Sequence, residues 1–212
     1  SSDLAMRYIG ASPGRGGYGS SLAASMILLQ TREVLSSLFN LPDSSRMLFT
    51  SNTTMSLNMA FMGSLNPGDH VVTTSMEHNS LLRPLFMLEK RGVQLDLVQT
   101  ARDGIVDPNE VRKAIKTNTK MIAVAHVSNV TGGIQPIAEL SAIARESSLL
   151  MLLDAAQSAG SIPIDMQAMG IDILAAPGHK GLMGPQGTGI LAVMPHVQLI
   201  PVIAGGTGSS SD

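Results

Sequence analysis

The chain has 212 residues, of which 44% are hydrophobic and 14% are charged, and its formal net charge is −2. This length is enough to bury the core of one domain, and the charge provides no basic field that would attract nucleic acid. There are no cysteines, which excludes disulfides and thiolate metal sites, and no apolar run approaches the ~18 residues that a membrane span needs. We therefore expect a cytoplasmic protein with no nucleic-acid, membrane or metal partner.

Predicted helices and strands alternate along most of the chain. A long helix is predicted for residues 20–40. Asp107 and Pro108 begin a second helix as N-cap and first-turn proline, and Pro136 opens a third. Seven short apolar runs have the length and continuous hydrophobicity of strands that are covered on both faces. These runs are residues 47–50, 70–74, 93–98, 121–126, 149–154, 171–175 and 189–194.

This alternation predicts an α/β fold with a mostly parallel seven-stranded sheet and helices on both faces. The last two strands are joined by residues 177–188, which leave no room for a crossover helix, so we expect the last strand to run antiparallel. We divide the chain into an N-terminal glycine-rich segment and helix, residues 1–45, and a larger domain, residues 46–212.

A glycine-rich run near the N-terminus, residues 14–19, matches the dinucleotide-binding pattern G-x-G-x-x-G. No strand is predicted before it, and Ser12 and Pro13 indicate a turn, so the context of a dinucleotide fold is missing. We interpret the run as an active-site or interface loop. NAD binding is an alternative that depends on this pattern alone.

The strongest candidate for chemistry is Lys180, between glycines and between two predicted strands. A lysine there would lie at the end of the sheet, where open α/β folds bind ligands. Burial can keep a lysine neutral, so that it can attack an aldehyde. Asp154 directly ends an apolar run, and a buried carboxylate needs a cationic partner, for which a protonated pyridine nitrogen would serve. A solvated loop for Lys180 and a helix cap or salt bridge for Asp154 are the alternatives.

Three further polar groups follow predicted strands. Thr53 and Thr54 stand at the start of a helix, where hydroxyls and free N–H groups bind phosphate. His78 could stack on a flat cofactor and relay protons, and Asn129 could donate to a phenolate oxygen. Each also has an ordinary interpretation as a helix cap or a polar loop residue. Because parallel strands end at one edge of a sheet, the whole set describes a pyridoxal-phosphate (PLP) site.

Five runs resemble, in order, the motifs of class V aminotransferases, a family of PLP-dependent enzymes, and most of all its cysteine desulfurase and selenocysteine lyase branch. The likeness covers nearly the whole chain, and residues 181–189 and 205–209 extend it. The five runs are Thr50-Ser51-Asn52-Thr53-Thr54, Ser75-Met76-Glu77-His78-Asn79-Ser80, His126-Val127-Ser128-Asn129-Val130-Thr131-Gly132, Asp154-Ala155-Ala156-Gln157 and Gly178-His179-Lys180.

The resemblance implies a role for each residue of the candidate site. Lys180 would form the internal aldimine with PLP and move protons at the substrate Cα. His78 would stack on the ring and assist acid–base steps, and Asp154 would pair with the pyridine nitrogen. The remaining implied roles are Gln157 and Asn129 beside the phenolate oxygen, Thr53, Thr54 and His179 on the phosphate, and Thr207 on the phosphate of a partner subunit.

The resemblance also implies a fold type I large domain, a homodimer, an amino-acid substrate, and desulfurase- or lyase-like cleavage of a C–S or C–Se bond, with a sulfur-acceptor protein as a further partner. Another class V activity, such as an aminotransferase or epimerase, is an alternative. So is a truncated, catalytically incompetent fragment that binds PLP or a partner.

The chain departs from the family pattern in several places. Pro177 stands where a serine or threonine is usual, so one phosphate contact is lost, and Asn52 and Met55 replace a commoner glycine and glutamate. The family's opening strand and its small C-terminal domain, with the carboxylate-binding arginine and the sulfur-accepting cysteine, are not in this sequence. We expect a fragment that covers the large domain, with a natural truncation as the alternative.

Overall fold

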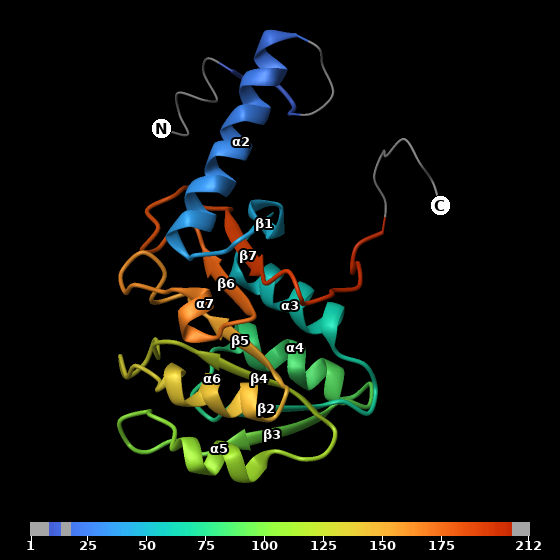
Figure 1. Ribbon diagram of the computed structural model, residues 1–212, viewed down its shortest axis with the longest axis vertical. Coiled ribbons are helices and arrows are strands. Elements are labelled where there is room, and N and C mark those ends of the chain that lie inside the picture. The colour runs from blue at the N-terminus through green and yellow to red at the C-terminus, as the bar shows by residue number, and fades with distance from the viewer. Residues whose placement is uncertain (1–8, 14–17, 205–212) are drawn as a thin grey trace.

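The computed structural model describes residues 9–13 and 18–204 (Figure 1). Thr207 and most of the glycine-rich run, residues 14–17, lie outside the described residues. The elements in chain order are α2 (Gly19–Leu38), η1 (Ser44–Arg46), β1 (Met47–Thr50), α3 (Thr53–Ser64), β2 (His70–Thr74), α4 (Asn79–Glu89), β3 (Gln94–Val98), α5 (Pro108–Ala114), β4 (Thr119–Ala125), α6 (Ile137–Glu146), β5 (Leu150–Asp154), α7 (Met166–Met169), β6 (Ile173–Pro177) and β7 (Gly189–Val193).

The seven predicted strands form one sheet in the order β1-β7-β6-β5-β4-β2-β3. β7 is antiparallel to both of its neighbours, β1 and β6, while the other neighbouring pairs are parallel. Six strands therefore share one direction and the last strand opposes them. The predicted α/β fold, with an antiparallel last strand, is confirmed.

Two apolar layers cover the sheet. On one face, α3 and α4 contribute Leu57, Phe61 and Leu85 to a cluster with Met121 of β4. On the other face, α5, α6 and α7 pack with the end of the α2 segment in a second cluster. Figure 1 shows the same two layers. Burial on both faces explains why the strands are continuous apolar runs.

The predicted helix starts are also confirmed. Asp107 is the N-cap of α5, where its side chain accepts a hydrogen bond from the Asn109 N–H at 2.8 Å, and Pro108 takes the first helical position. Pro136 stands directly before α6. These residues set the first turns of α5 and α6.

The N-terminal helix α2 stands away from the body of the molecule over much of its length (Figure 1). Phe39 and Leu41, just after α2, are buried in the core cluster, and Met166 N–H donates to the Phe39 carbonyl at 2.9 Å. The division of the chain at residue 45 stays a prediction. No helix in the described part of the chain is long and apolar enough to cross a membrane.

The strands β2 and β4 mark the place where the order of the sheet reverses. The next strand in the chain, β3, lies on one side of β2. The strands after it, β4 and β5, lie on the other side. The register of β2 with β4 runs from His70–Thr119 to Val72–Ile122 and goes no further, although β2 continues to Thr74 and β4 to Ala125. In open α/β sheets, such a reversal point opens a crevice at the carboxyl ends of the strands.

Candidate active site

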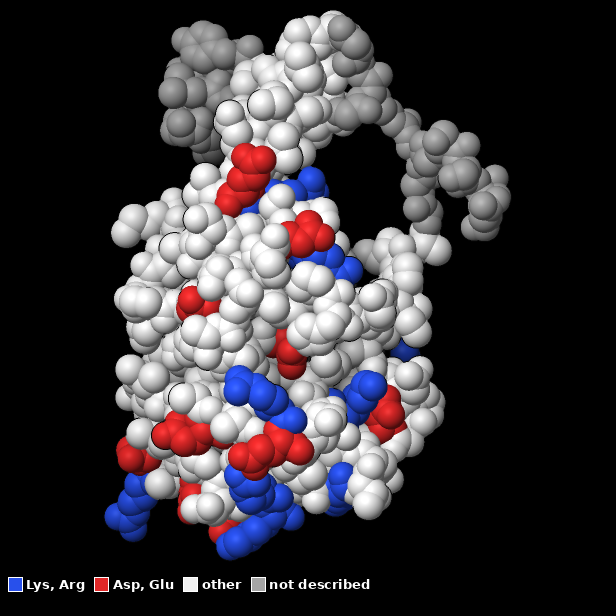
Figure 2. All heavy atoms as spheres, viewed as in Figure 1, with Lys and Arg blue, Asp and Glu red and all other residues white. Residues whose placement is uncertain are grey.

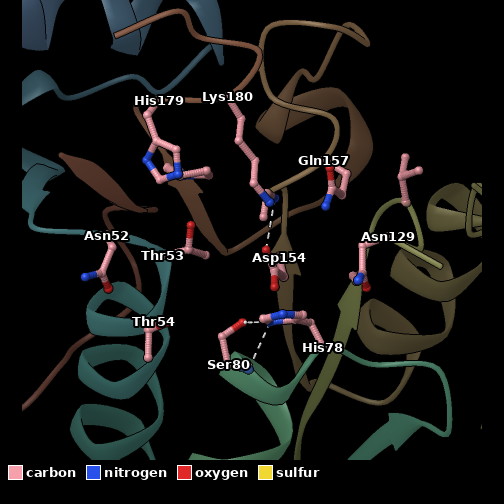
Figure 3. A pocket seen from close by; sticks show the side chains of 14 residues that line it. Asn52, Thr53, Thr54, His78, Ser80, Asn129, Asp154, Gln157, His179 and Lys180 are labelled. Carbon is pink, nitrogen blue, oxygen red and sulfur yellow. Dashed lines mark hydrogen bonds between the residues drawn. The ribbon is translucent and has the colours of Figure 1, made fainter. Parts of the chain in front are cut away.

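A cavity of about 160 Å³ lies at the carboxyl ends of β2, β4, β5 and β6, beside the first turn of α3 (Figure 3). Eight of the nine site residues predicted from the sequence line it, and Thr207 lies outside the described residues. The eight are Thr53, Thr54, His78, Asn129, Asp154, Gln157, His179 and Lys180. Segments that are far apart in the sequence are therefore brought to one place, as the parallel topology predicts.

Lys180 reaches the cavity from the loop that joins β6 to β7. Gly178 N–H donates to the Thr188 carbonyl at 2.8 Å, which closes the base of this loop. Gly181 lies so close to the Ala159 carbonyl that a Cβ atom there would collide with it, and a Cβ on Gly160 would collide with Gly181 in turn. Glycines thus allow the backbone of the lysine loop to rest directly on the loop that follows Asp154.

Asp154 ends β5 and is 2% exposed. Its Oδ1 accepts a hydrogen bond from the Ala156 N–H at 2.9 Å. Burial raises the pKa of Asp154, while the Ala156 bond and the charges of His78 and Lys180 act to lower that pKa. This carboxyl is therefore buried with cationic groups around it, and a further cation in the cavity would stabilise its charged form.

His78 is the N-cap of α4 and also lines the cavity. Its Nδ1 accepts from the Ser80 N–H at 3.1 Å and lies 2.7 Å from Ser80 Oγ. A ring that accepts at Nδ1 carries its proton on Nε2 when it is neutral. Figure 3 shows the ring facing Asp154 across the cavity. The same side chain therefore caps α4 and lines the cavity.

The first turn of α3 provides donors without partners. Asn52 caps the helix, where its side chain accepts from the Met55 N–H at 2.9 Å. Among the described residues, this leaves the N–H groups of Thr53 and Thr54 available to a ligand. Thr53 is 6% exposed, and its buried Oγ1 has no hydrogen-bond partner among the described residues. A buried hydroxyl that lines a cavity without a partner fits an anionic group such as the phosphate of PLP.

The other predicted residues surround the same space. Asn129 and Gln157 lie together on one side of the cavity in Figure 3, while Thr53, Thr54 and His179 lie on the opposite side. A flat ligand with a phosphate at one end and a phenolate oxygen at the other could span these two groups. Pro177 also lines the cavity and offers no hydroxyl, as its position in the sequence predicts.

The sequence analysis did not single out Glu77, which is buried next to Ala125 and His78 of the cavity lining. Thr74 Oγ1 donates to Glu77 Oε1 and the Ala125 N–H donates to Glu77 Oε2, each at 2.7 Å. Burial raises the pKa of Glu77 to about 8. The sequence did contain a signal for this residue. Glu77 is a carboxyl shortly after a buried strand, much as Asp154 is at the end of one, and it directly precedes His78. Asn52 and Ser80, which line the cavity, were also not chosen.

Comparisons with known proteins agree with this geometry. The family described as "Aminotransferase class-V" matches residues 5–210. A probable cysteine desulfurase of Methanothermobacter thermautotrophicus is 38% identical over 199 residues, which is 92% of this chain and 50% of that protein. The cysteine desulfurase IscS of Dictyoglomus turgidum is 37% identical over 77% of this chain and 42% of its own length.

Solved structures show the same relationship. The apo cysteine desulfurase of Thermococcus onnurineus NA1 superposes with a TM-score of 0.90 at 33% identity, over 96% of this chain and 52% of that one. A structure described as SspA in complex with cysteine gives a TM-score of 0.87 at 29% identity, over 95% of this chain and 59% of that one. The chain spans about half the length of the curated relatives it matches. Because the family match covers nearly all of its residues, the chain belongs to the class V aminotransferases, a PLP-dependent family.

Proposed function

We propose that this chain is the PLP-binding large domain of a cysteine desulfurase-like enzyme, and that Lys180 is the residue that binds the PLP aldehyde covalently. The observation that carries the proposal is the convergence on one cavity of Lys180, Asp154 and the Thr53 hydroxyl, which has no hydrogen-bond partner in the part of the chain that the structure describes. A covalent amine, a buried carboxylate and a phosphate site are the three groups that PLP requires of a protein.

When bound, PLP supplies an electron sink for the bonds at the substrate Cα. Asp154 would hold a proton on the pyridine nitrogen, because its buried carboxylate gains most from a cation nearby. Lys180 Nζ would take a proton from the substrate Cα and return it. His78 would pack on the ring and donate or accept a proton at Nε2.

The substrate class follows from the relatives. Cysteine desulfurases are the curated proteins that resemble this chain, and one solved neighbour is described with cysteine. We therefore assign C–S or C–Se cleavage of an amino acid such as cysteine or selenocysteine to the whole enzyme. A transaminase or epimerase would share the residues described here and differ in residues beyond them.

The proposed partners are a second copy of the chain and a sulfur-acceptor protein, in the cytoplasm. Thr207, outside the described residues, would reach the phosphate of the second copy. We also propose that the chain is a fragment of a longer enzyme, since its relatives are about twice as long. The residues that bind the substrate carboxylate and accept sulfur would then lie in the other half.

The direct test is the absorbance spectrum of the purified chain after addition of PLP, for the wild type and for Lys180→Ala. We expect a visible band in the wild type that borohydride removes, and no such band in Lys180→Ala. Lys116→Ala is a matched control, because Lys116 is an exposed lysine outside the cavity, paired with Asp96.

A band that persists in Lys180→Ala would contradict the assignment of this lysine. A folded wild type that produces no band would show that the chain does not form a PLP site, and would favour the interpretation as a partner-binding fragment. If PLP binds and no amino acid is turned over even by the longer protein, the fragment is a non-catalytic PLP-binding relative.

A further inference from the structure

The crevice between β2 and β4 has two polar side chains across it. Where the backbone register ends, Thr73 Oγ1 donates to the Ala123 carbonyl at 2.6 Å. Nearer the cavity, Glu77, which follows β2 in the chain, accepts a hydrogen bond from the Ala125 N–H of β4 at 2.7 Å. Side chains therefore replace the backbone hydrogen bonds that the separating strands no longer make.

Glu77 is bound on both sides of the crevice. Its Oε1 contacts Thr74 Oγ1, on the last residue of β2, at 2.7 Å, and Thr74 Oγ1 also accepts from the Met76 N–H at 3.2 Å. These contacts tie the turn between β2 and α4 to the end of β4. His78, the next residue, caps α4 and lines the cavity, so the position of the turn determines the position of the imidazole.

The neighbourhood of Glu77 favours a bridging role over a charged one. Burial raises the pKa of Glu77 most strongly, the hydrogen bonds from Thr74 and Ala125 act to lower it, and the charge of Asp154 adds to the rise. The charges of His78 and Lys180 act to lower the pKa of Asp154 instead. A protonated Glu77 keeps both contacts, because the proton on Oε1 can be donated to Thr74 Oγ1 while Oε2 still accepts from Ala125.

We propose that Glu77 is a positioning residue that joins the separated ends of β2 and β4 and thereby holds His78 at the cavity. It does not touch the space where a cofactor would lie. The inference rests on the proposed function only in taking the cavity beside His78 as a PLP site. The bridge between the strands can be tested in protein without PLP. A glutamine has the same length and the same pair of contacts available, whereas alanine and aspartate are too short to reach Ala125.

The experiment compares Glu77→Gln, Glu77→Ala and Glu77→Asp in the full chain. The first measurement, without PLP, is hydrogen exchange at the Ala125 amide. We expect exchange to be faster by about tenfold in the alanine and aspartate variants, and within about threefold of the wild type in the glutamine variant. The second measurement is the dissociation constant of PLP, which should rise by about tenfold in alanine and aspartate and recover in glutamine.

Thr73→Val is the matched control, because it removes the other bridge across the same crevice without touching Glu77 or the cavity. We expect it to leave both the Ala125 exchange rate and the PLP affinity within about threefold of the wild type. If Glu77→Ala does not fold, Glu77→Asp still tests the reach of the side chain.

Equal losses in Glu77→Gln and Glu77→Ala would overturn the inference, because the charge and not the bridge would then be essential. Unchanged exchange at Ala125 in Glu77→Ala and Glu77→Asp would overturn it as well. A wild type that binds no PLP contradicts the proposed function alone, since the exchange measurement still decides whether Glu77 bridges the strands.

Discussion

Asp154 and Glu77 are two buried carboxyls near the ends of strands β5 and β2. Different neighbouring groups act on their pKa values. Asp154 has Lys180 and His78 as charged neighbours, which favour its ionised form, while Glu77 has a hydroxyl and a backbone N–H. When the environments of paired groups drive their pKa values apart, the two can take different roles. Burial raises the pKa of both carboxyls, but only Asp154 has the charges of His78 and Lys180 acting against that rise.

The raised pKa of Glu77 predicts a pH dependence of stability. Between its ordinary value of 4.5 and about 8, the folded chain holds a proton that the unfolded chain has released. The contribution of Glu77 to the free energy of unfolding is therefore full below pH 4.5, decreases between pH 4.5 and about 8, and is lost above that. Glu77→Gln lacks this titration, so its melting temperature relative to the wild type should rise between pH 5 and pH 8. Differences that stay constant with pH would contradict the raised pKa.

The Thr53 hydroxyl, to which no described residue is hydrogen-bonded, predicts a loss of PLP affinity that depends on the phosphate group. Thr53→Ala should weaken PLP binding by about tenfold, since a hydrogen bond to a charged group is lost, and Thr53→Ser should restore most of it. Binding of pyridoxal, which has no phosphate, should be the same in all three proteins. Titrations of both ligands, followed by absorbance, provide the measurement. A similar loss for pyridoxal would assign Thr53 a different role.

At the scale of elements, sequence periodicity predicted each strand but not every boundary. The predictions for β1 and β2 match the structure, whereas β6 runs over Ile173–Pro177 and not residues 171–175. Pro177 extends the strand because it pairs with Gly189 of β7, a contact between distant residues that local periodicity does not contain. The crevice between β2 and β4, and with it the role of Glu77, also depends on strand order, which the sequence analysis did not predict.

The candidate site was more predictable than the boundaries, and for a physical reason. Polar residues such as Asp154 and Asn129 interrupt apolar runs at the ends of parallel strands, and those ends meet at one edge. Topology alone therefore assembles the site. Contacts between loops, such as that of Gly181 with Ala159, were beyond sequence reasoning because they depend on the exact path of the backbone.

The contact between the two glycine loops predicts the effect of a single methyl group. Gly181→Ala would place a Cβ against the Ala159 carbonyl and displace the lysine loop, so PLP affinity should fall by about tenfold or more. Gly19→Ala is the control, because a Cβ at this position in α2 has no neighbouring atom within 4 Å. Equilibrium titration with PLP measures both. Wild-type affinity in Gly181→Ala would show that the loop can shift without moving Lys180.

On the scale of the whole molecule, α2 stands away from the body over much of its length (Figure 1). Large apolar side chains are exposed on all its sides, including Leu22 at 64% and Val34 at 68%. Figure 2 shows few charges along this helix except near its lower end, whereas charges of both signs gather lower on the molecule. Exposed large apolar side chains gathered on one helix are typical of a surface that associates with another protein, and we expect this of α2.

We expect the purified chain to self-associate through α2. Replacing Leu22 and Val34 together by lysine should shift the molar mass from light scattering towards that of the monomer, because charges oppose burial of this helix. Met87→Lys serves as the control, since Met87 is an exposed apolar residue on α4. Association that survives the double substitution would place the contact on another surface.

The pairing of β1 with β7 has a consequence for synthesis of the chain. Within the described sheet, β1 has β7 as its single neighbour, and Met47 meets Ala192 there, so β1 leaves the ribosome well before the strand with which it pairs. At ordinary elongation rates, that delay is roughly ten to thirty seconds. During this interval, β1 is an unpaired edge available to other nascent chains. Selection at β1 and β7 would therefore act on yield in the cell as well as on the stability of the finished fold.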